Sequence, residues 1–376
     1  MTTITQRPTG VEDVRPRHGA AGRDFGPLRW VPRAVVYLLL AYWLLVLVPD
    51  SEVYAPIAAD AAIYSIVGLS LNIIIGYTGQ LSLGHQGFFG VGAFAAAYSL
   101  TVQGVPFAAT FVIAAAVGGL FAFLIGIVAL RITGLYLALI TLVFGLTLEA
   151  SLFEVPRFTN GGAGQPAERP EFLFDNGNFY LFCLVFLAAA VYLDWRLMKS
   201  KTGRALLALK ENERVAEAFG VNVTLFKLIA FVLSGSLAGV AGALFAFRIE
   251  IVSASGFGFF LALTFVLMTV VGGLGNRIGV IMGSSFFAAI GYILEETPVH
   301  AVEEFIFRTS NLQQFAPQFI GAFLLLITLV LFPGGLAQQT KWALDWLSGK
   351  PFSLQTMLHA GKESGPGTAE GSHVRA

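Results

Sequence analysis

The segment RLMKSKTGRALLALKENERVAEAFGVNVTLFK, residues 196–227, lies between two long apolar runs and is the most charged internal part of the chain. Its middle predicts one short amphipathic helix, because mostly apolar residues recur there at three- and four-residue steps. This stripe consists of Ala205, Leu209, Asn212, Ala216 and Phe219. Such a helix is either a solvated connector on a bilayer surface or a docking element for a cytoplasmic partner.

Charged side chains occupy the rest of this predicted helix. The pairs Lys210/Glu213 and Arg214/Glu217 are close enough in sequence to interact on a helix surface. Gly220 follows the stripe at the position where a helix C-cap glycine belongs. The segment therefore predicts a defined helix rather than an irregular loop.

The composition identifies the class of protein. The chain has 376 residues, of which 56% are hydrophobic and 12% charged, and its mean hydropathy is +0.74. An average soluble domain carries about 25% charged residues. No water-soluble core could enclose this much apolar surface, so we expect an all-α polytopic membrane protein without a nucleic-acid partner. The single cysteine, Cys183, cannot form an intrachain disulfide and indicates plain packing.

The apolar runs predict about ten transmembrane helices, because a span needs about 20 residues. Two of the runs are short, and the one at residues 87–101 follows a glycine-rich break, which indicates an interrupted element. The runs cover residues 34–48, 57–76, 87–101, 106–130, 135–153, 178–195, 225–247, 251–271, 278–294 and 316–332.

The distribution of charge predicts the orientation. Six arginines lie in residues 1–33 and seven basic residues in 196–227, whereas the loops at 154–177 and 295–315 are acidic. Basic loops stay in the cytoplasm. An even number of spans with both termini cytoplasmic places every basic loop inside and both acidic loops outside. Residues 1–33 and 337–376 are predicted to be mostly disordered, on either side of a membrane domain at 34–336 with a cytoplasmic loop at 196–227.

The stretch YSIVGLSLNIIIGYTGQLSLGHQGFFGVGAFAAAY, residues 64–98, mixes glycines with polar residues at membrane depth. Irregular chain there is tolerated only inside protein or beside water. The glycines favour close helix packing. The polar side chains favour a translocation pathway, although a packed histidine explains His85 equally well. The candidate pathway residues are Asn72, Thr78, Gln80, Ser82 and His85.

A second glycine-rich break, VVGGLGNRIGVIMGSSF at residues 270–286, resembles the first. Gly76-x-x-Gly79-Gln80 corresponds to Gly272-x-x-Gly275-Asn276. Weak internal repeats with interrupted helices in matching positions point to a transporter core.

No motif indicates an enzyme. The sequence has no phosphate-binding loop of the form G-x-x-x-x-G-K-[ST], no H-E-x-x-H, no C-x-x-C and no G-x-S-x-G. No second histidine or carboxylate stands at metal-ligand spacing from His85. We therefore predict no catalytic residue, no metal site and no cofactor.

The sequence resembles the membrane permease subunits of branched-chain amino-acid ABC importers, the LivH/LivM type. Of these two subunits, it resembles LivM more closely. The segments that carry the resemblance lie at residues 68–97, 201–223, 270–284 and 332–336, the last being FPGGL. Val280 stands where relatives usually have proline, and residues 159–165 are only loosely similar to the corresponding loop of the family. Both departures concern the identity of the solute, because the family also includes permeases for urea, short amides and other small solutes.

The resemblance implies a multi-pass permease of the bacterial inner membrane, without ATPase activity of its own. The implied partners are a second, homologous permease subunit, two cytoplasmic ATP-binding subunits, an extracytoplasmic solute-binding protein and membrane lipid. It also implies that the helix in residues 201–220 docks on the ATPase with its apolar stripe. The residues implied in this coupling are Gly203, Arg204, Leu209, Glu211, Asn212, Ala216 and Gly220.

A stand-alone secondary transporter or channel is the competing hypothesis. Ion-coupled carriers usually place acidic residues deep in several spans. The predicted span interiors are almost free of them, which favours an external source of energy. A structural scaffold would not explain the polar glycine-rich breaks.

Overall fold

The computed structural model describes residues 41–129, 134–159 and 164–296, together with positions 36, 38, 39, 132 and 323. This part of the chain is mostly helical, as predicted. Its β-structure is one antiparallel pair of two-residue strands, β1 (Gln165–Pro166) and β2 (Ile251–Val252). The predicted run at residues 316–332 and both predicted disordered tails lie outside the residues described here, apart from position 323.

The helical elements follow one another with short connections. In chain order they are η2 (Trp43–Leu47), α2 (Tyr54–Leu71) with its π-helical continuation η3 (Asn72–Gly76), α3 (His85–Thr101), α4 (Phe107–Ala129), α5 (Leu135–Thr147) with its π-helical continuation η4 (Leu148–Leu152), α6 (Pro156–Thr159), η6 (Glu171–Leu173), α7 (Asn176–Lys199), α8 (Lys201–Glu211), α9 (Glu213–Ala218), α10 (Val223–Ile249), η7 (Ala254–Phe257), α11 (Phe259–Gly272) and α12 (Arg277–Glu296).

Six helical segments in the described residues are long and apolar enough to cross a membrane. They are Tyr54–Gly76, Phe107–Val128, Leu135–Leu152, Asn176–Lys199, Val223–Ile249 and Ala254–Gly272. Each matches a predicted run. The runs at 87–101 and 278–294 form α3 and α12, and α3 is short, as predicted. Of the run at 34–48, the structure describes residues 41–48 and three earlier positions. The protein is therefore a multi-pass membrane protein.

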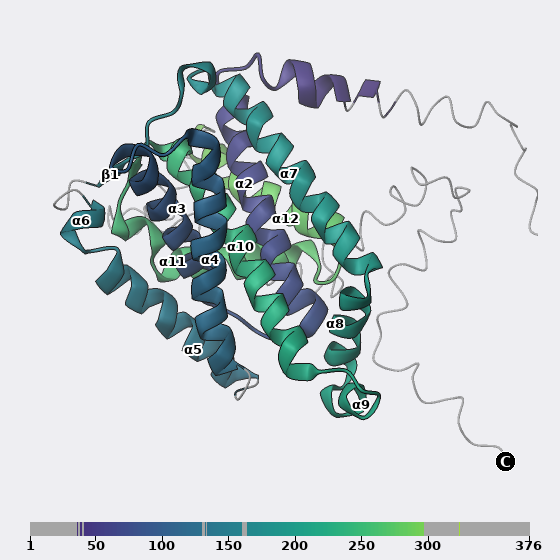
Figure 1. Cartoon of the computed structure of the whole chain (residues 1–376). Coiled ribbons are helices and arrows are strands. Elements are labelled where there is room, and N and C mark those ends of the chain that lie inside the picture. Colours follow the sequence, from purple (N-terminus) through teal and green to yellow (C-terminus); the bar gives the residue numbers. More distant parts are fainter. Residues whose placement is uncertain are drawn as a thin grey trace, which may run out of the picture.

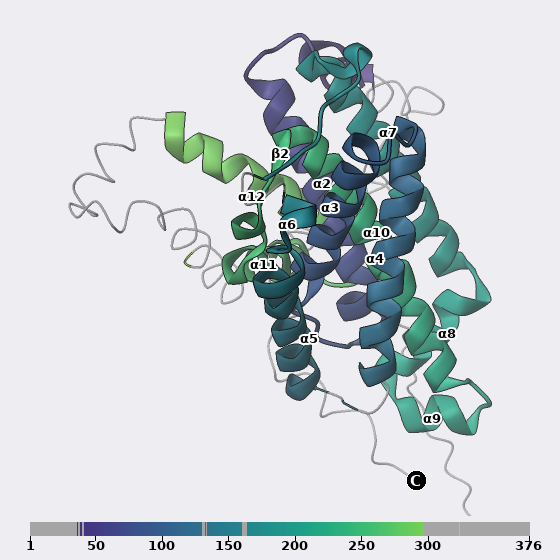
Figure 2. The same ribbon diagram turned by 60° about the vertical axis from the view of Figure 1, so that its left-hand side comes forward.

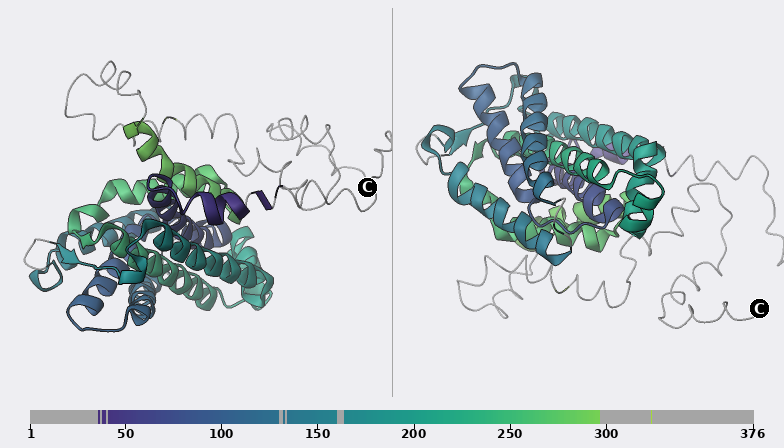
Figure 3. Two further views of the ribbon diagram at one scale, coloured as in Figure 1. Left: turned by 90° about the horizontal axis from the view of Figure 1, so that it is seen from above. Right: turned by 60° about the horizontal axis from the view of Figure 1, so that its bottom comes forward.

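Helix α2 lies at the centre of the bundle. It packs against α7, α10, α11 and α12, and it is the most enclosed of the six spanning segments. Figures 1 and 2 show α4 on one side of the bundle and α12 on the opposite side, and Figure 3 shows the same order in views tipped about the horizontal axis. Helices α8 and α9 lie together at one end, where α7 ends and α10 begins (Figure 1). We name this the α8 end, and the opposite end the β1–β2 end.

Helices α3, α4 and α10 are in direct backbone contact. A methyl group on Gly92 of α3 would overlap the carbonyl oxygen of Gly239 in α10. One on Gly239 would overlap the carbonyl oxygen of Ala114 in α4, and one on Gly242 that of Phe89 in α3. In membranes, such small residues let helices approach closely enough for backbone packing. Of the glycines in residues 64–98, for which close helix packing was predicted, Gly92 is confirmed in this role.

Candidate functional site

The chain is not helical between Thr78 and the start of α3. Residues 79–84 have no regular structure, and Gly79 adopts a φ of 71°, which favours glycine. Two backbone amides of this segment find partners within the protein, since Gln80 N–H donates to Ile74 O (3.2 Å) and Leu83 N–H donates to Thr141 Oγ1 (3.0 Å). Irregular backbone at membrane depth must be satisfied in this way. The interruption predicted before α3 is confirmed.

His85, the first residue of α3, joins a buried chain of hydroxyl groups. Its Nε2 lies 2.7 Å from Ser234 Oγ on α10, and its Nδ1 lies 3.2 Å from Ser82 Oγ. The Ser234 hydroxyl donates to Ser70 O on α2 (2.7 Å), and the Ser70 hydroxyl donates to Ser234 O (2.8 Å). Each ring nitrogen of His85 therefore has a hydroxyl partner. These hydrogen bonds join α3 to the irregular segment 79–84 and to α10, and Ser234 continues them to α2.

All five predicted pathway residues are buried, but the structure brings only Ser82 and His85 into contact. Thr78 donates its hydroxyl to Ile74 O of its own helix (2.5 Å), and Asn72 accepts from the other glycine-rich break. Ser70 and Ser234 belong to the same polar chain as His85 and were not predicted. Serines inside apolar runs give no sequence signal that separates them from packing residues.

Two buried amides have no hydrogen-bond partner among the described residues. Gln80 and Gln86 are 5% and 0% exposed, and neither the amide oxygen nor the amide nitrogen of either side chain is bonded. Gly145 on α5 makes room for Gln86, because a methyl group there would overlap the Gln86 amide. A buried polar group without a partner costs about 1–3 kcal/mol. These amides are therefore available to a polar ligand, and Gln86 is a candidate that the sequence analysis did not select.

The two glycine-rich breaks meet in space. Gly275 N–H donates to Asn72 Oδ1 (2.8 Å), and a Cβ on Gly76 would lie 2.9 Å from Gly275 N. The matched positions Gly79 and Gly275 both have positive φ, 71° and 82°. The sequence similarity between the breaks is therefore accompanied by the same backbone conformation and by direct contact.

The predicted single amphipathic helix is two helices. It breaks at Asn212, whose backbone is extended (φ −163°, ψ 112°) and whose Oδ1 accepts from Arg214 N and Val215 N. Asparagine is a strong N-cap residue, and its side chain competes with helix continuation. The helix α8 begins in the same way at Ser200, whose Oγ accepts from Gly203 N (3.2 Å).

The apolar stripe faces the protein itself. Leu209 and Ala216 are 2% and 4% exposed and pack in a cluster with Ile73 and Tyr77. The expectation that this stripe packs on a partner is therefore wrong for these residues. Phe219, placed on the stripe by periodicity, is 85% exposed because the break at Asn212 rotates α9 relative to α8.

The outward face of α8 and α9 differs from the predicted one. It carries Arg204, Leu207, Glu211, Val215 and Phe219, all exposed. The local backbone structure explains why glycine stands at two positions of the segment. A methyl group on Gly203 would overlap Leu197 O at the corner between α7 and α8, and Gly220 ends α9 with a φ of 83°. The bonds Gly220 N–Glu217 O and Val221 N–Ala216 O complete that C-cap, as predicted.

Lys210 and Glu213 bind other partners than predicted. Glu213 pairs with Lys227 of α10 (2.7 Å), instead of Lys210. Lys210 Nζ donates to Gly76 O at the end of η3 (2.8 Å). Lys210 thus connects α8 directly to the first glycine-rich break. It binds Gly76, the residue that lies beside Gly275 of the second break.

A buried carboxylate lies at the same end. Asp194 of α7 has a side chain with no exposed surface, and its Oδ2 accepts from Arg277 Nε at the start of α12 (2.8 Å) and from Tyr77 OH (3.2 Å). This ion pair ties α7 to both glycine-rich breaks. Asp194 and Arg277 lie 83 residues apart in sequence, so no local pattern indicates the pair.

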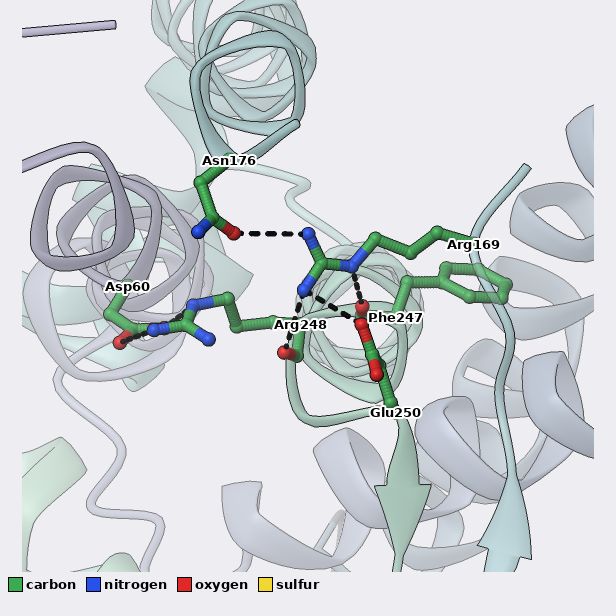
Figure 4. A network of polar contacts seen from close by, with 6 residues as sticks. All are labelled: Asp60, Arg169, Asn176, Phe247, Arg248 and Glu250. Atoms are coloured by element: carbon green, nitrogen blue, oxygen red, sulfur yellow. Dashed lines mark hydrogen bonds and ion pairs between the residues drawn. The ribbon is translucent and has the colours of Figure 1, made fainter. Parts of the chain in front are cut away.

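At the β1–β2 end, Arg169 caps the last turn of α10 (Figure 4). Its guanidinium donates to Phe247 O (2.8 Å) and to Asn176 Oδ1 (3.2 Å), and it pairs with Glu250 (3.1 Å). Glu250 ends α10 in the left-handed conformation, with a φ of 63°. Burial lowers the pKa of Arg169 and the Glu250 carboxylate opposes this shift, so the guanidinium stays charged at neutral pH.

A second ion pair lies beside it, between Arg248 of α10 and Asp60 of α2 (3.2 Å, Figure 4). The two pairs attach the loop that carries Arg169, together with α2, to the end of α10. Among the described residues, no group of three or more histidines, cysteines and carboxylates could hold a metal ion.

Comparison with known proteins gives one consistent family. Residues 53–326 match the family described as branched-chain amino acid transport system / permease component. The chain is 31% identical over 262 residues to the high-affinity branched-chain amino acid transport system permease protein LivM of Salmonella typhimurium, and 30% identical to that of Escherichia coli. Each alignment covers 61% of this chain and 60% of the relative.

A third relative, a probable branched-chain amino acid transport permease protein LivH of Methanocaldococcus jannaschii, is 35% identical over 135 residues, which cover 33% of this chain and 39% of the relative. The chain thus aligns with about three fifths of the length of the first two curated relatives. No solved structure matches it.

Proposed function

This chain belongs to the family of branched-chain amino acid transport permease components, and from this premise we propose that it is a membrane-spanning subunit of an ATP-driven importer. The proposed solute is a branched-chain amino acid or a related small polar molecule. The proposed setting is the bacterial inner membrane, with a second permease subunit, two ATP-binding subunits and an extracytoplasmic binding protein. The observation that carries the proposal is the contact between Lys210 and Gly76, which joins the candidate docking helix to the interrupted helices of the core.

The docking surface is the outward face of α8 and α9. Leu207, Val215 and Phe219 offer apolar contacts there, beside the charged Arg204 and Glu211. Amphipathic helices bind grooves through such anchors. The buried residues Leu209, Ala216 and Gly203 take part indirectly, because they fix both helices on the bundle. Asn212 and Gly220 set the angle at which α9 leaves α8 and meets α10.

Motion of the docking helices would reach the core through two connections. Lys210 holds Gly76, and Asp194 at the end of α7 holds Arg277 at the start of α12. Both connections end beside a glycine-rich break, where a π-helix or irregular backbone gives the chain a local point of deformation. Rigid-body movement of α8 would therefore change the relation between η3 and α12, which is the kind of displacement that alternating access requires.

The polar groups next to η3 would contact the solute. His85 and Ser82 offer hydrogen-bonding groups, the unbonded amides of Gln80 and Gln86 offer both donors and acceptors, and the unbonded amide nitrogen of Asn72 offers a donor. Such groups suit the amino and carboxyl ends of a small polar solute. Binding of such a solute by these polar groups does not require a charged side chain among them.

Energy from an ion gradient is the competing explanation, and two ion pairs weigh against it. Asp60 and Asp194, two of the three carboxylates within the described spans, each face an arginine. A carboxylate held in this way does not supply a free site for a coupling ion.

The proposal is tested by reconstitution. The chain, co-expressed with its partner subunits and placed in vesicles, should accumulate solute only when ATP and the binding protein are present. If the chain alone accumulates solute from a sodium or proton gradient, the proposal is wrong.

A further inference from the structure

An open groove of about 690 Å³ runs between α4, α7 and α10 and lies toward the α8 end. Figure 1 shows α10 between the other two helices. Its walls are aliphatic, with Leu193 from α7 and Leu233, Leu237 and Val240 from α10. Leu193 and Leu233 are exposed, and α7 is the least enclosed of the six spanning segments. The groove is therefore open on the outer surface of the described bundle.

The end of the groove toward α8 is basic. Arg196 and Lys199, both exposed, line it together with Ser200 and Trp195. The ammonium group of Lys199 lies 3.9 Å from the centre of the Trp195 ring, a cation–π contact that holds it at the mouth. The only carboxylate in the lining, Asp194, is bonded to Arg277 and Tyr77 and has no exposed surface. The mouth therefore presents two cations with no carboxylate of the lining left to neutralise them.

We propose that this groove binds an anionic phospholipid, with an acyl chain along the aliphatic walls and the phosphate between Arg196 and Lys199. The volume lies within the range of ligand pockets, about 300–1,000 Å³. Tryptophan and lysine at the membrane interface commonly contact headgroups, and basic sites between helices on the cytoplasmic side bind acidic lipids. The site is separate from the solute pathway, so the proposal does not depend on the proposed transport function.

The charges favour lipid over a protein helix as the occupant. A helix of another subunit packed into the groove would remove Arg196 and Lys199 from water, which is costly without acidic partners. A lipid phosphate supplies the missing negative charge and leaves the outer side of both cations hydrated. Zwitterionic lipids fill the aliphatic part equally well but give a weaker electrostatic contact, which makes the headgroup the discriminating feature.

The experiment compares phosphatidylglycerol with phosphatidylcholine of the same acyl chains. The permease, purified as the assembly in which it is expressed, is exchanged into detergent containing either lipid, and bound lipid is counted by native mass spectrometry. The test variant is Arg196→Gln/Lys199→Gln. The matched control is Lys201→Gln/Arg214→Gln, which removes the same charge from exposed positions of α8 and α9 that do not line the groove. A phosphatidylglycerol with a photoreactive acyl chain then locates the site.

We expect phosphatidylglycerol to be retained in preference to phosphatidylcholine, retention to fall about tenfold in the test variant, and the control to match the parent protein. Crosslinks should fall on residues 190–200 and 233–240 and disappear in Leu237→Trp, which fills the groove. Equal retention of both lipids, full retention in the test variant, or crosslinks only elsewhere would overturn the proposal. A protein crosslinked from a photoreactive residue at position 237 would show that another subunit occupies the groove.

Discussion

The side chain of Lys210 and the main chain of Gly76 are joined across 134 residues of sequence by one 2.8 Å hydrogen bond. The bond leaves a surface helix and ends at the π-helical turn η3, where Gly76 also faces Gly275. A hydrogen bond from a charged donor contributes about 1.5–3 kcal/mol. In the proposed mechanism, this bond would carry a displacement of α8 to the core.

Replacing Lys210 with methionine should uncouple transport from ATP hydrolysis. Methionine keeps an unbranched aliphatic side chain but cannot donate to Gly76. We expect solute uptake to fall about tenfold while the assembly continues to hydrolyse ATP, a change equivalent to about 1.4 kcal/mol. Lys201→Met, at an exposed position of the same helix, is the control. Unchanged uptake in Lys210→Met would remove this bond from the mechanism.

Changes on α8 should separate assembly from transport. Arg204→Glu reverses a charge on the outward face, and Ala208→Pro breaks the helix at a cost of about 3 kcal/mol. We expect both variants to insert into the membrane and to lose ATP-driven uptake, as measured in vesicles with radiolabelled solute. Normal uptake in both would count decisively against docking by this helix.

Replacing Gln86 with leucine should make the protein more stable and less active. The amide is 0% exposed and unbonded, so removing it relieves a cost of about 1–3 kcal/mol. The melting temperature of the purified protein should rise, whereas uptake should fall, with the ATPase still co-purifying. Gln103→Leu, at an exposed position between α3 and α4, serves as the control. A rise in stability with full transport would assign Gln86 to packing alone.

His85→Ala and Gln80→Leu provide an independent test of the same site. Both residues are buried beside the irregular segment 79–84. Transport should change in each variant without loss of the associated ATPase. If uptake and solute selectivity stay at the level of the parent protein, these side chains serve only structure.

The ion pair between Asp194 and Arg277 should respond asymmetrically to mutation. The Asp194 side chain is 0% exposed and that of Arg277 27%. Arg277→Gln leaves a buried carboxylate without its counter-charge, which costs about 3–5 kcal/mol. Asp194→Asn leaves an arginine that can reach water, so the melting temperature should fall less. The opposite order of melting temperatures would contradict this account of the pair.

Most of the helices could be predicted from the sequence, because an apolar run of about 20 residues has few alternatives to a span. The interruption before α3 and the end of α9 at Gly220 were also predictable, since both depend on local glycine chemistry. The burial of His85 and the polar residues near it in sequence was predictable for another reason, because they lie within an apolar segment.

The rest depends on tertiary structure. Periodicity placed Asn212 on a helical stripe, but its side chain caps a new helix instead. Periodicity also cannot tell whether an apolar stripe faces the chain itself or a partner; Leu209 faces the chain. The partners of Asp194, Ser234 and Lys210 all lie more than 80 residues away along the chain, so no local pattern reveals them.

The glycine contacts among α3, α4 and α10 hold these three helices together at their main chains, and we expect them to form a fixed frame. Sliding of these helices along one another would drive the carbonyl of Ala114 or Gly239 into the opposing main chain. The segments around residues 79–84 and 273–276, which have no regular helix, are the places where the backbone would bend most easily. Under the proposed function, such a division between a stationary frame and two adjustable joints would allow a small displacement of α8 and α9 at the membrane surface to change the access of solute.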